Sequence, residues 1–392
     1  MTNIEDEIGA SASMVGQLKE RLPIVGRLTP VFTTLAIFAV AVVSWWLIGD
    51  PKWSIAGARA TGPDDEAAKL AVVSCVLFWA ILGLIFTGFT FGNWPFSKLR
   101  QPIAGFAQVA VNVVIGILGT LLFTHGVGQW DPTFSANTAG GAGYTAAAFI
   151  VLIGFYAYAF PVTSLGGYPF EAVTSPTSGT AQWLLGAFLT VIGVVALIYP
   201  NFNAQLSSSA PVSLPKVTGW IYSSIVIVIA GGMLWGNWPW AGIANRHLRA
   251  LAALIATLGG GYLLMLVFEA VLRQILPTQI LERQGFPLAL ETAQLGVFFA
   301  ISSLISGLIF GPSKIESVVA ARIFRTLIVT VAAILSYVLF MRFFATTVLH
   351  FPAVEGSYGG NPLLWVDWMI LIVLWHAVAF GGHFSTRRAR VR

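Results

Sequence analysis

The side chains able to do chemistry in this chain of 392 residues are the ionisable ones that fall within its long apolar segments. Glu269, Arg342 and Asp367 stand about one helical turn in from the outer end of such a segment, and His125 stands at the edge of another. Ionisable groups at this depth in a bilayer are costly and mark functional sites by default. We expect them to form an outer vestibule that gathers or gates a small solute. The structural alternative is an interfacial cluster that holds the loops in place.

Spacing relates some of these residues to one another. Glu269 and Arg273 are four residues apart on one predicted helix, so they can pair on one face. His125 and Glu269 are 144 residues apart, an interval that recurs elsewhere in the chain. The two residues are therefore predicted to occupy equivalent positions in two copies of one repeated unit.

Deeper polar side chains are few. Gln108 and Asn112 lie four residues apart in one apolar segment, and Ser302, Ser303 and Ser306 cluster in another. Such residues more often join helices by hydrogen bonds than line a pathway, and both interpretations stay open. A pathway without deep charge would suit a neutral or singly charged small molecule.

Histidines raise the alternative of a redox site. His125 and His350 are expected near the same membrane surface and could supply two axial ligands to one haem, whereas His376 and His383 are expected near the other surface. No zinc-type or haem-attachment motif is present, and the single Cys75 excludes a disulfide within the chain and a cysteine metal cluster. No nucleotide-binding loop or nucleophile elbow occurs. We therefore predict no cofactor, and the chain is more typical of a non-enzyme.

The elements that must position these residues are membrane spans. The chain is 57% hydrophobic and only 9% charged, whereas soluble proteins are about 25% charged. Segments of about 20 apolar residues span a bilayer as helices. Ten segments meet this length, at about 30–49, 70–91, 102–124, 143–165, 180–199, 217–236, 249–272, 291–310, 324–345 and 363–382. The sequence predicts an all-α integral membrane protein with one transmembrane domain over 30–383.

Basic residues orient the spans. Fourteen Lys and Arg flank the ends that face the same side as both termini, and six flank the opposite ends. Both termini are therefore predicted to be cytoplasmic, in a cytoplasmic (inner) membrane of bacterial type. This orientation accounts for the net charge of +5 without a nucleic-acid partner. Residues 1–29 are expected to form a tail or an interfacial helix, and 384–392 a basic tail.

A turn motif recurs at the predicted cytoplasmic ends of the even-numbered spans. Its copies are FGNWPF (Phe91 to Phe96), GGYPF (Gly166 to Phe170), WGNWPW (Trp235 to Trp240), FGPSK (Phe310 to Lys314) and FGGHF (Phe380 to Phe384). The intervals between their glycines Gly92, Gly166, Gly236, Gly311 and Gly381 are 74, 70, 75 and 70 residues. Glycine suits a left-handed helix cap, proline ends the helix, and the aromatic residue anchors the turn at the interface. The alternative is a cytoplasmic mouth surrounded by Trp94, Trp238 and His383.

The spacing predicts five tandem helical hairpins, at about 30–100, 101–175, 176–246, 247–320 and 321–384. Five parallel copies can close as a pseudo-fivefold ring around a central axis. This architecture resembles that of tellurite-resistance/dicarboxylate transporters and plant guard-cell anion channels in helix count and topology, and no motif transfers a residue role.

The leading hypothesis is a channel or secondary transporter for a small solute. The alternatives are a membrane subunit of an oxidoreductase or other complex that binds haem or quinone, and a structural scaffold. The expected partners are the lipid bilayer, the small solute, and further copies of the chain or other membrane subunits.

Overall fold

The computed structural model describes residues 24–54, 63–171, 176–284, 286–313, 315–351 and 361–382. Within these residues the secondary structure is helical and contains no strand. Ten helices are long and apolar enough to span a membrane. The predicted all-α membrane class and the predicted number of spans are confirmed. The predicted N-terminal interfacial helix, the tail 384–392 and His383 lie outside the described residues.

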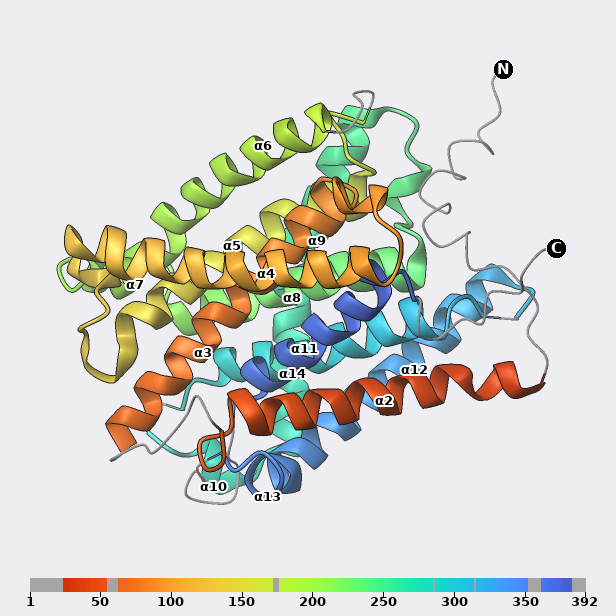
Figure 1. The fold of residues 1–392 in the computed structure, drawn as a ribbon. Helices are drawn as coiled ribbons and strands as arrows, with labels where there is room; N and C mark the ends of the chain where they lie inside the picture. Colours follow the sequence, from red (N-terminus) through yellow and green to blue (C-terminus); the bar gives the residue numbers. More distant parts are fainter. Residues whose placement is uncertain are drawn as a thin grey trace.

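The ten spans correspond closely to the predicted segments. They run over Thr29–Ile48, Ala67–Thr90, Ile103–Gln129, Ala139–Leu165, Thr177–Phe202, Leu214–Trp235, Arg246–Ile275, Leu288–Ile309, Val318–Thr347 and Pro362–Ala379. The helices that carry them are α2 (Ile24–Ile48), α3 (Pro63–Leu84), α4 (Ile103–Leu121), α5 (Ala142–Leu165), α6 (Thr177–Gly193), α8 (Leu214–Trp235), α9 (Arg246–Ile275), α11 (Leu288–Leu304), α12 (Val318–Leu339) and α14 (Pro362–Leu374). Figure 1 shows their arrangement.

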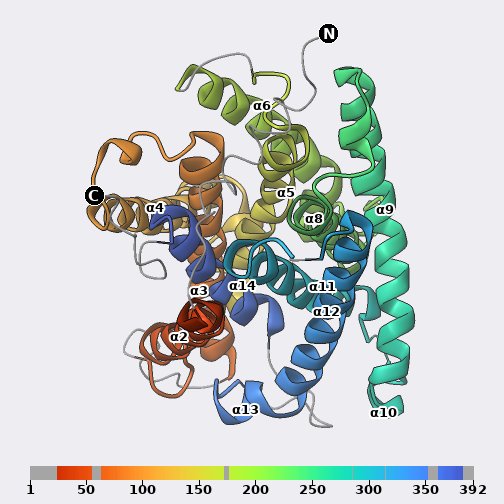
Figure 2. The same cartoon turned by 90° about the vertical axis from the view of Figure 1, so that its right-hand side faces the viewer.

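Burial divides the spans into two classes that alternate along the chain. In the even-numbered spans, carried by α3, α5, α8, α11 and α14, between 56% and 72% of the most apolar stretch is buried. In the odd-numbered spans the buried share is between 17% and 28%. The view in Figure 2 shows the first set near the centre of the bundle and α2, α4, α6, α9 and α12 around it.

The five inner helices contact one another in a closed cycle. α3 packs against α5, α5 against α8, α8 against α11, α11 against α14, and α14 against α3. Each outer helix covers one inner helix: α4 covers α3, α6 covers α5, α9 covers α8, α12 covers α11, and α2 covers α14. An outer helix therefore packs chiefly against the span that precedes it, and the first span packs against the last.

Small residues bring the inner and outer helices close together. A Cβ atom added to Gly116 of α4 would lie 2.6 Å from the backbone oxygen of Val76 in α3. A Cβ atom added to Gly261 of α9 would come closer still to the hydroxyl of Ser224 in α8. Without a strong hydrophobic force between helices in lipid, such close packing is a main source of helix association.

The five inner spans share one backbone geometry at the ends that carry the turn motif. Gly92, Gly166, Gly236, Gly311 and Gly381 all have positive φ, between 55° and 71°. This conformation is the left-handed cap that glycine adopts at little cost, and the predicted caps are confirmed. In the two turns that contain Asn-Trp-Pro, Asn93 and Asn237 also have positive φ, of 62° and 59°.

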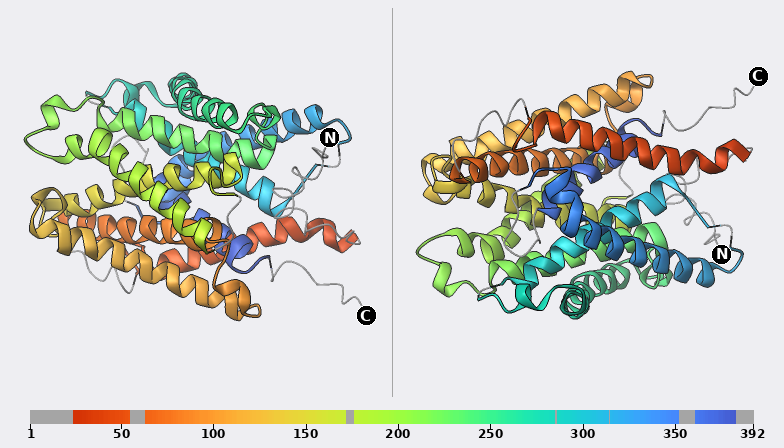
Figure 3. Two further views of the ribbon diagram at one scale, coloured as in Figure 1. Left: turned by 90° about the horizontal axis from the view of Figure 1, so that it is seen from above. Right: turned by 90° about the horizontal axis from the view of Figure 1, so that it is seen from below.

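The outer helices differ in tilt. Figure 3 shows α2 and α4 running in a similar direction, whereas α9 is seen nearly end-on in both views. α9 has 30 residues, a length of about 45 Å, whereas the hydrocarbon core is about 30 Å thick. A steep tilt accommodates a helix of this length in a bilayer.

Candidate functional site

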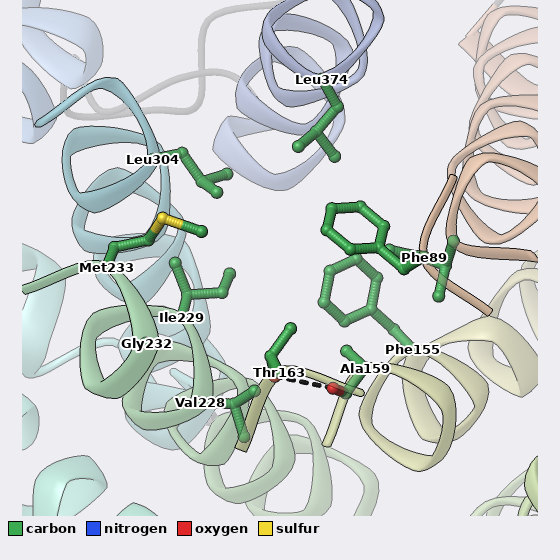
Figure 4. Close-up of a pocket in the computed structure, with 11 residues that line it drawn as sticks. Phe89, Phe155, Ala159, Thr163, Val228, Ile229, Gly232, Met233, Leu304 and Leu374 are labelled. Carbon is green, nitrogen blue, oxygen red and sulfur yellow. Dashed lines mark hydrogen bonds between the residues drawn. The ribbon is translucent and has the colours of Figure 1, made fainter. Parts of the chain in front are cut away.

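A small apolar cavity lies where the five inner helices face one another. Its volume is about 40 Å³. Figure 4 shows the side chains that surround it. The lining residues are Ile85, Phe89, Phe155, Ala159, Thr163, Val228, Ile229, Gly232, Met233, Leu304 and Leu374. All five inner spans contribute, so the cavity lies inside the ring.

Five of the lining residues hold the same position relative to the turn glycines. Ile85, Ala159, Ile229, Leu304 and Leu374 each precede the glycine of their own span by seven residues. Residues at equivalent positions of repeated units lie at equal depth when the units surround an axis. The cavity thus lies inside the closed cycle of helix contacts, at one fixed distance along the chain from each turn glycine.

The cavity wall offers little polar chemistry. Thr163 is its one side chain with a hydroxyl, and that hydroxyl donates to the backbone oxygen of Ala159 at 2.6 Å. Phe89 and Phe155 present aromatic rings. π-Helical turns begin at or directly after lining residues, at Ile85–Thr90, Ile305–Ile309 and Trp375–Ala379. Such turns interrupt regular helix geometry and often occur at functional sites.

Asp367 lies on the side of this cavity that is farther from the turn glycines. It is 5% exposed, and its Oδ1 accepts a hydrogen bond of 2.9 Å from the hydroxyl of Tyr222 in α8. Its Oδ2 has no hydrogen-bond partner. Seven residues, about 10 Å of helix, separate Asp367 from the cavity residue Leu374, and the same number separates Tyr222 from Ile229. The two side chains therefore meet about two turns from the cavity.

The sequence interpretation missed another buried carboxylate within the spans, Glu291. It is 8% exposed and accepts hydrogen bonds from Tyr337 of α12 at 3.1 Å and from Gln294 at 3.0 Å. Both carboxylate oxygens are thus bonded. Glu291 is the first residue of a predicted span, and a carboxylate at a span boundary gives no sign of burial.

Gln108 and Asn112 belong to one buried network between α3 and α4. The Gln108 Nε2 atom donates to the Thr87 hydroxyl at 3.1 Å and to Asn93 Oδ1 at 3.0 Å. The Asn112 amide lies 3.0 Å from the same Thr87 hydroxyl. These contacts join the outer helix to the turn motif through Asn93. They favour a packing role for the two amides.

The three serines of span 8 have different surroundings. Ser306 accepts hydrogen bonds of 3.3 Å from Nε and Nη2 of Arg325 in α12. Ser303 is 1% exposed, and its hydroxyl has no hydrogen-bond partner. Ser302 is half-buried. A charged group from an outer helix therefore reaches the π-helical turn beside cavity residue Leu304, which the sequence did not predict.

The remaining residues of the predicted outer vestibule are spread over the periphery. His125, Arg273 and Arg342 are exposed, and Glu269 is half-buried. Among the described residues, no hydrogen bond or ion pair joins any two of His125, Glu269, Arg273 and Asp367. Asp367 is the one vestibule residue that lies in the interior of the ring.

The two histidines considered as haem ligands make separate contacts. His350 Nδ1 lies 2.7 Å from Oδ2 of the fully buried Asp50, which follows the end of α2. His125 Nδ1 lies 2.9 Å from the Thr124 hydroxyl. These contacts tie each ring to its own surroundings and do not bring the histidines together. No group of three His, Cys, Asp or Glu able to hold a metal occurs in the described part of the chain.

The predicted mouth residues that the structure describes in the turn motifs are exposed. Trp94 and Trp238 are 40% and 53% exposed. The Trp238 ring stacks on Trp235 at a centroid distance of 5.8 Å. Both exposed rings suit an interfacial anchor or a mouth, and their geometry favours neither.

The carboxylate of Asp131, which lies outside the spans, holds the loop that follows span 3. Asp131 Oδ1 accepts from the backbone N–H of Thr133 at 2.9 Å. Partial burial alone would raise the pKa of Asp131, but hydrogen bonds from the Thr133 hydroxyl, the Thr133 backbone and the Tyr199 hydroxyl hold it below its ordinary value. Asp131 thereby links the loop after span 3 to the end of span 5.

The spacing of the turn glycines carries a signal for the Asp367 site. Tyr222 and Asp367 are 145 residues apart, and each precedes its turn glycine by 14 residues. The remaining members of this layer are Phe78, Leu152 and Val297. Aligning the spans on their glycines would have placed the phenol and the carboxylate at the same depth.

Comparison of the chain with protein-family models, with curated proteins and with solved structures finds no match.

Proposed function

We propose that this protein is a membrane channel or secondary transporter that moves a small solute along the axis of its inner helix ring. The observation that carries the proposal is the cavity lined by the same repeat position of all five inner spans. An apolar site inside a ring of spanning helices is where a solute could cross without meeting lipid.

The proposal includes a pseudo-fivefold arrangement of five tandem helix pairs. The closed cycle of inner helices and the five left-handed turn glycines support it. The excess of basic residues beside the turns supports cytoplasmic termini, and hence insertion in an inner membrane of bacterial type. Each structural pair consists of an inner helix and the outer helix that follows its turn, and α2 completes the set by packing on α14.

The cavity limits the solute class. A volume of about 40 Å³ is a few times the roughly 10 to 15 Å³ that one water needs by the same measure, so the cavity admits only a molecule of a few heavy atoms. Its wall lacks a charged group, so a bare ion would lose hydration without compensation. We infer a small neutral solute, and transport rather than catalysis as the activity. This function requires no cofactor, haem, quinone or nucleic acid.

A flux assay in proteoliposomes tests the proposal. The purified chain is reconstituted and challenged with small neutral compounds, small amides and small anions. We expect flux of at least one neutral compound above that of protein-free vesicles. Ala159→Leu should reduce it at least tenfold, because the added carbons fill the cavity.

Ala110→Leu is the matched control, since Ala110 is exposed on the outer helix α4. It should retain wild-type flux. Absence of flux for every compound, or equal flux in the two leucine variants with equal folded protein, would contradict the proposal.

A further inference from the structure

The contact between Tyr222 and Asp367 crosses the interior of the ring. Tyr222 belongs to α8 and Asp367 to α14, and α11 lies between these helices in the cycle of contacts. A Cβ added to Gly296 of α11 would lie 3.5 Å from Cδ1 of Tyr222, so the tyrosine ring passes along α11. The contact therefore links two helices that are not neighbours in the cycle.

The carboxyl group of Asp367 is incompletely bonded. Its Oδ1 accepts from Tyr222, whereas its Oδ2 is buried without a partner. A buried carboxylate charge costs far more than a buried neutral acid unless it is paired. The neutral acid is therefore the favoured form while this contact stays closed to water.

Among the residues that the structure describes, no cation forms an ion pair with Asp367. Titratable or charged side chains occur on the span that carries Asp367 and on the elements that pack against or bond to this span. Those that the structure describes are His376, Glu291, Lys69, Cys75, Lys216 and Tyr222. Glu291 is turned to Tyr337 and Gln294. Tyr222 is the residue that hydrogen-bonds to Asp367 in the described part of the chain.

Resting on the proposed function, we propose that Asp367 is a proton-binding site of the solute pathway. As the Tyr222–Asp367 contact closes, the carboxylate takes a proton from hydronium: an O–H bond forms on the carboxyl group, and an O–H bond of hydronium breaks to leave water. When the contact opens and hydrates the site, the carboxyl O–H bond breaks and the proton returns to water as hydronium. Opening of the pathway on the outer side is thereby linked to proton release.

Infrared spectroscopy tests this assignment without knowledge of the solute. The full-length protein at neutral pH should show a protonated-carboxyl C=O band that disappears in Asp367→Asn. The band should persist in Glu291→Gln, the matched control, which removes another buried carboxylate within the spans. In Tyr222→Phe the band should shift to higher frequency, because the carboxyl loses its hydrogen-bond donor. If Asp367→Asn does not fold, the band shift in Tyr222→Phe still tests whether the band belongs to Asp367.

The two proposals fail in different ways. If no carboxyl band at neutral pH depends on Asp367 and none shifts in Tyr222→Phe, Asp367 is ionised and the proton site is refuted, whatever the flux result. If the band is present but no solute crosses, the proton site stands and the transport function fails. Where flux occurs, proton movement should accompany it in the wild type and vanish in Asp367→Asn. Equal proton movement in both proteins would refute the linkage.

Discussion

At the scale of single residues, buried polar side chains divide into those that are fully bonded and those that are not. Gln108, Thr87 and Asn93 satisfy one another between α3 and α4. Asp367 keeps one oxygen without a partner inside the ring. The first arrangement stabilises helix packing, and the second belongs to the site we propose to act in transport.

Gln108→Leu should lower the free energy of unfolding by about 1 to 2 kcal/mol, because the Thr87 hydroxyl and Asn93 Oδ1 lose a buried donor. Denaturant or thermal unfolding in detergent measures the change. Val111→Leu, at an exposed position of the same helix, should change stability by less than about 0.5 kcal/mol. Equal stability of the two variants would show that the network contributes nothing.

Acid should destabilise the loop after span 3, which Asp131 holds by hydrogen bonds. Its pKa is held below the ordinary value of 3.8. A group with a lowered folded-state pKa contributes stability above its unfolded-state pKa and loses it as the pH falls through the folded-state value. Below about pH 4, amide exchange at Thr133 and Phe134, normalised for the intrinsic rate, should therefore rise. Asp131→Asn should show faster exchange at neutral pH and no such acid step.

At the scale of helices, close packing of inner against outer spans holds the ring. Gly116→Val should destabilise the protein by about 1 to 3 kcal/mol, because its side chain meets the Val76 backbone oxygen. Gly259→Ala is the control: no atom lies within 4 Å of an added Cβ there. Alanine in a helix is favoured over glycine by about 1 kcal/mol, so this variant should be neutral or more stable. A stable Gly116→Val protein would contradict the α3–α4 packing.

Several features of the helices could be predicted from the sequence. Span number follows from apolar length, and the left-handed turns follow from glycine before an aromatic residue or proline. Helix pairing was harder to predict. α2 packs on α14, more than 300 residues away in the chain, and the Trp45 indole donates to the Leu349 backbone oxygen. Hydropathy carries no information about such distant partners.

At the scale of the whole molecule, the spacing of the turn glycines and the cavity describe one arrangement. The position seven residues before each turn glycine lines the cavity in all five inner spans. The vestibule predicted from single residues is distributed differently, since His125, Arg273 and Arg342 are exposed and Asp367 is buried. Distance from a span end predicts depth in the membrane, but it does not tell which face of a helix a side chain occupies.

Water accessibility of the cavity tests the axial pathway most directly. Ala159→Cys is made in a Cys75→Ser background, so the new thiol is the sole one in the chain, and reconstituted protein is treated with iodoacetamide. Alkylation requires the thiolate, which forms in contact with water and is suppressed in apolar surroundings. We expect modification of Ala159→Cys, a fall in flux after modification, and little modification of Ala110→Cys on the outer surface. If Ala159→Cys in folded, reconstituted protein is as inert as Ala110→Cys, no aqueous path reaches the cavity and the axial pathway is refuted.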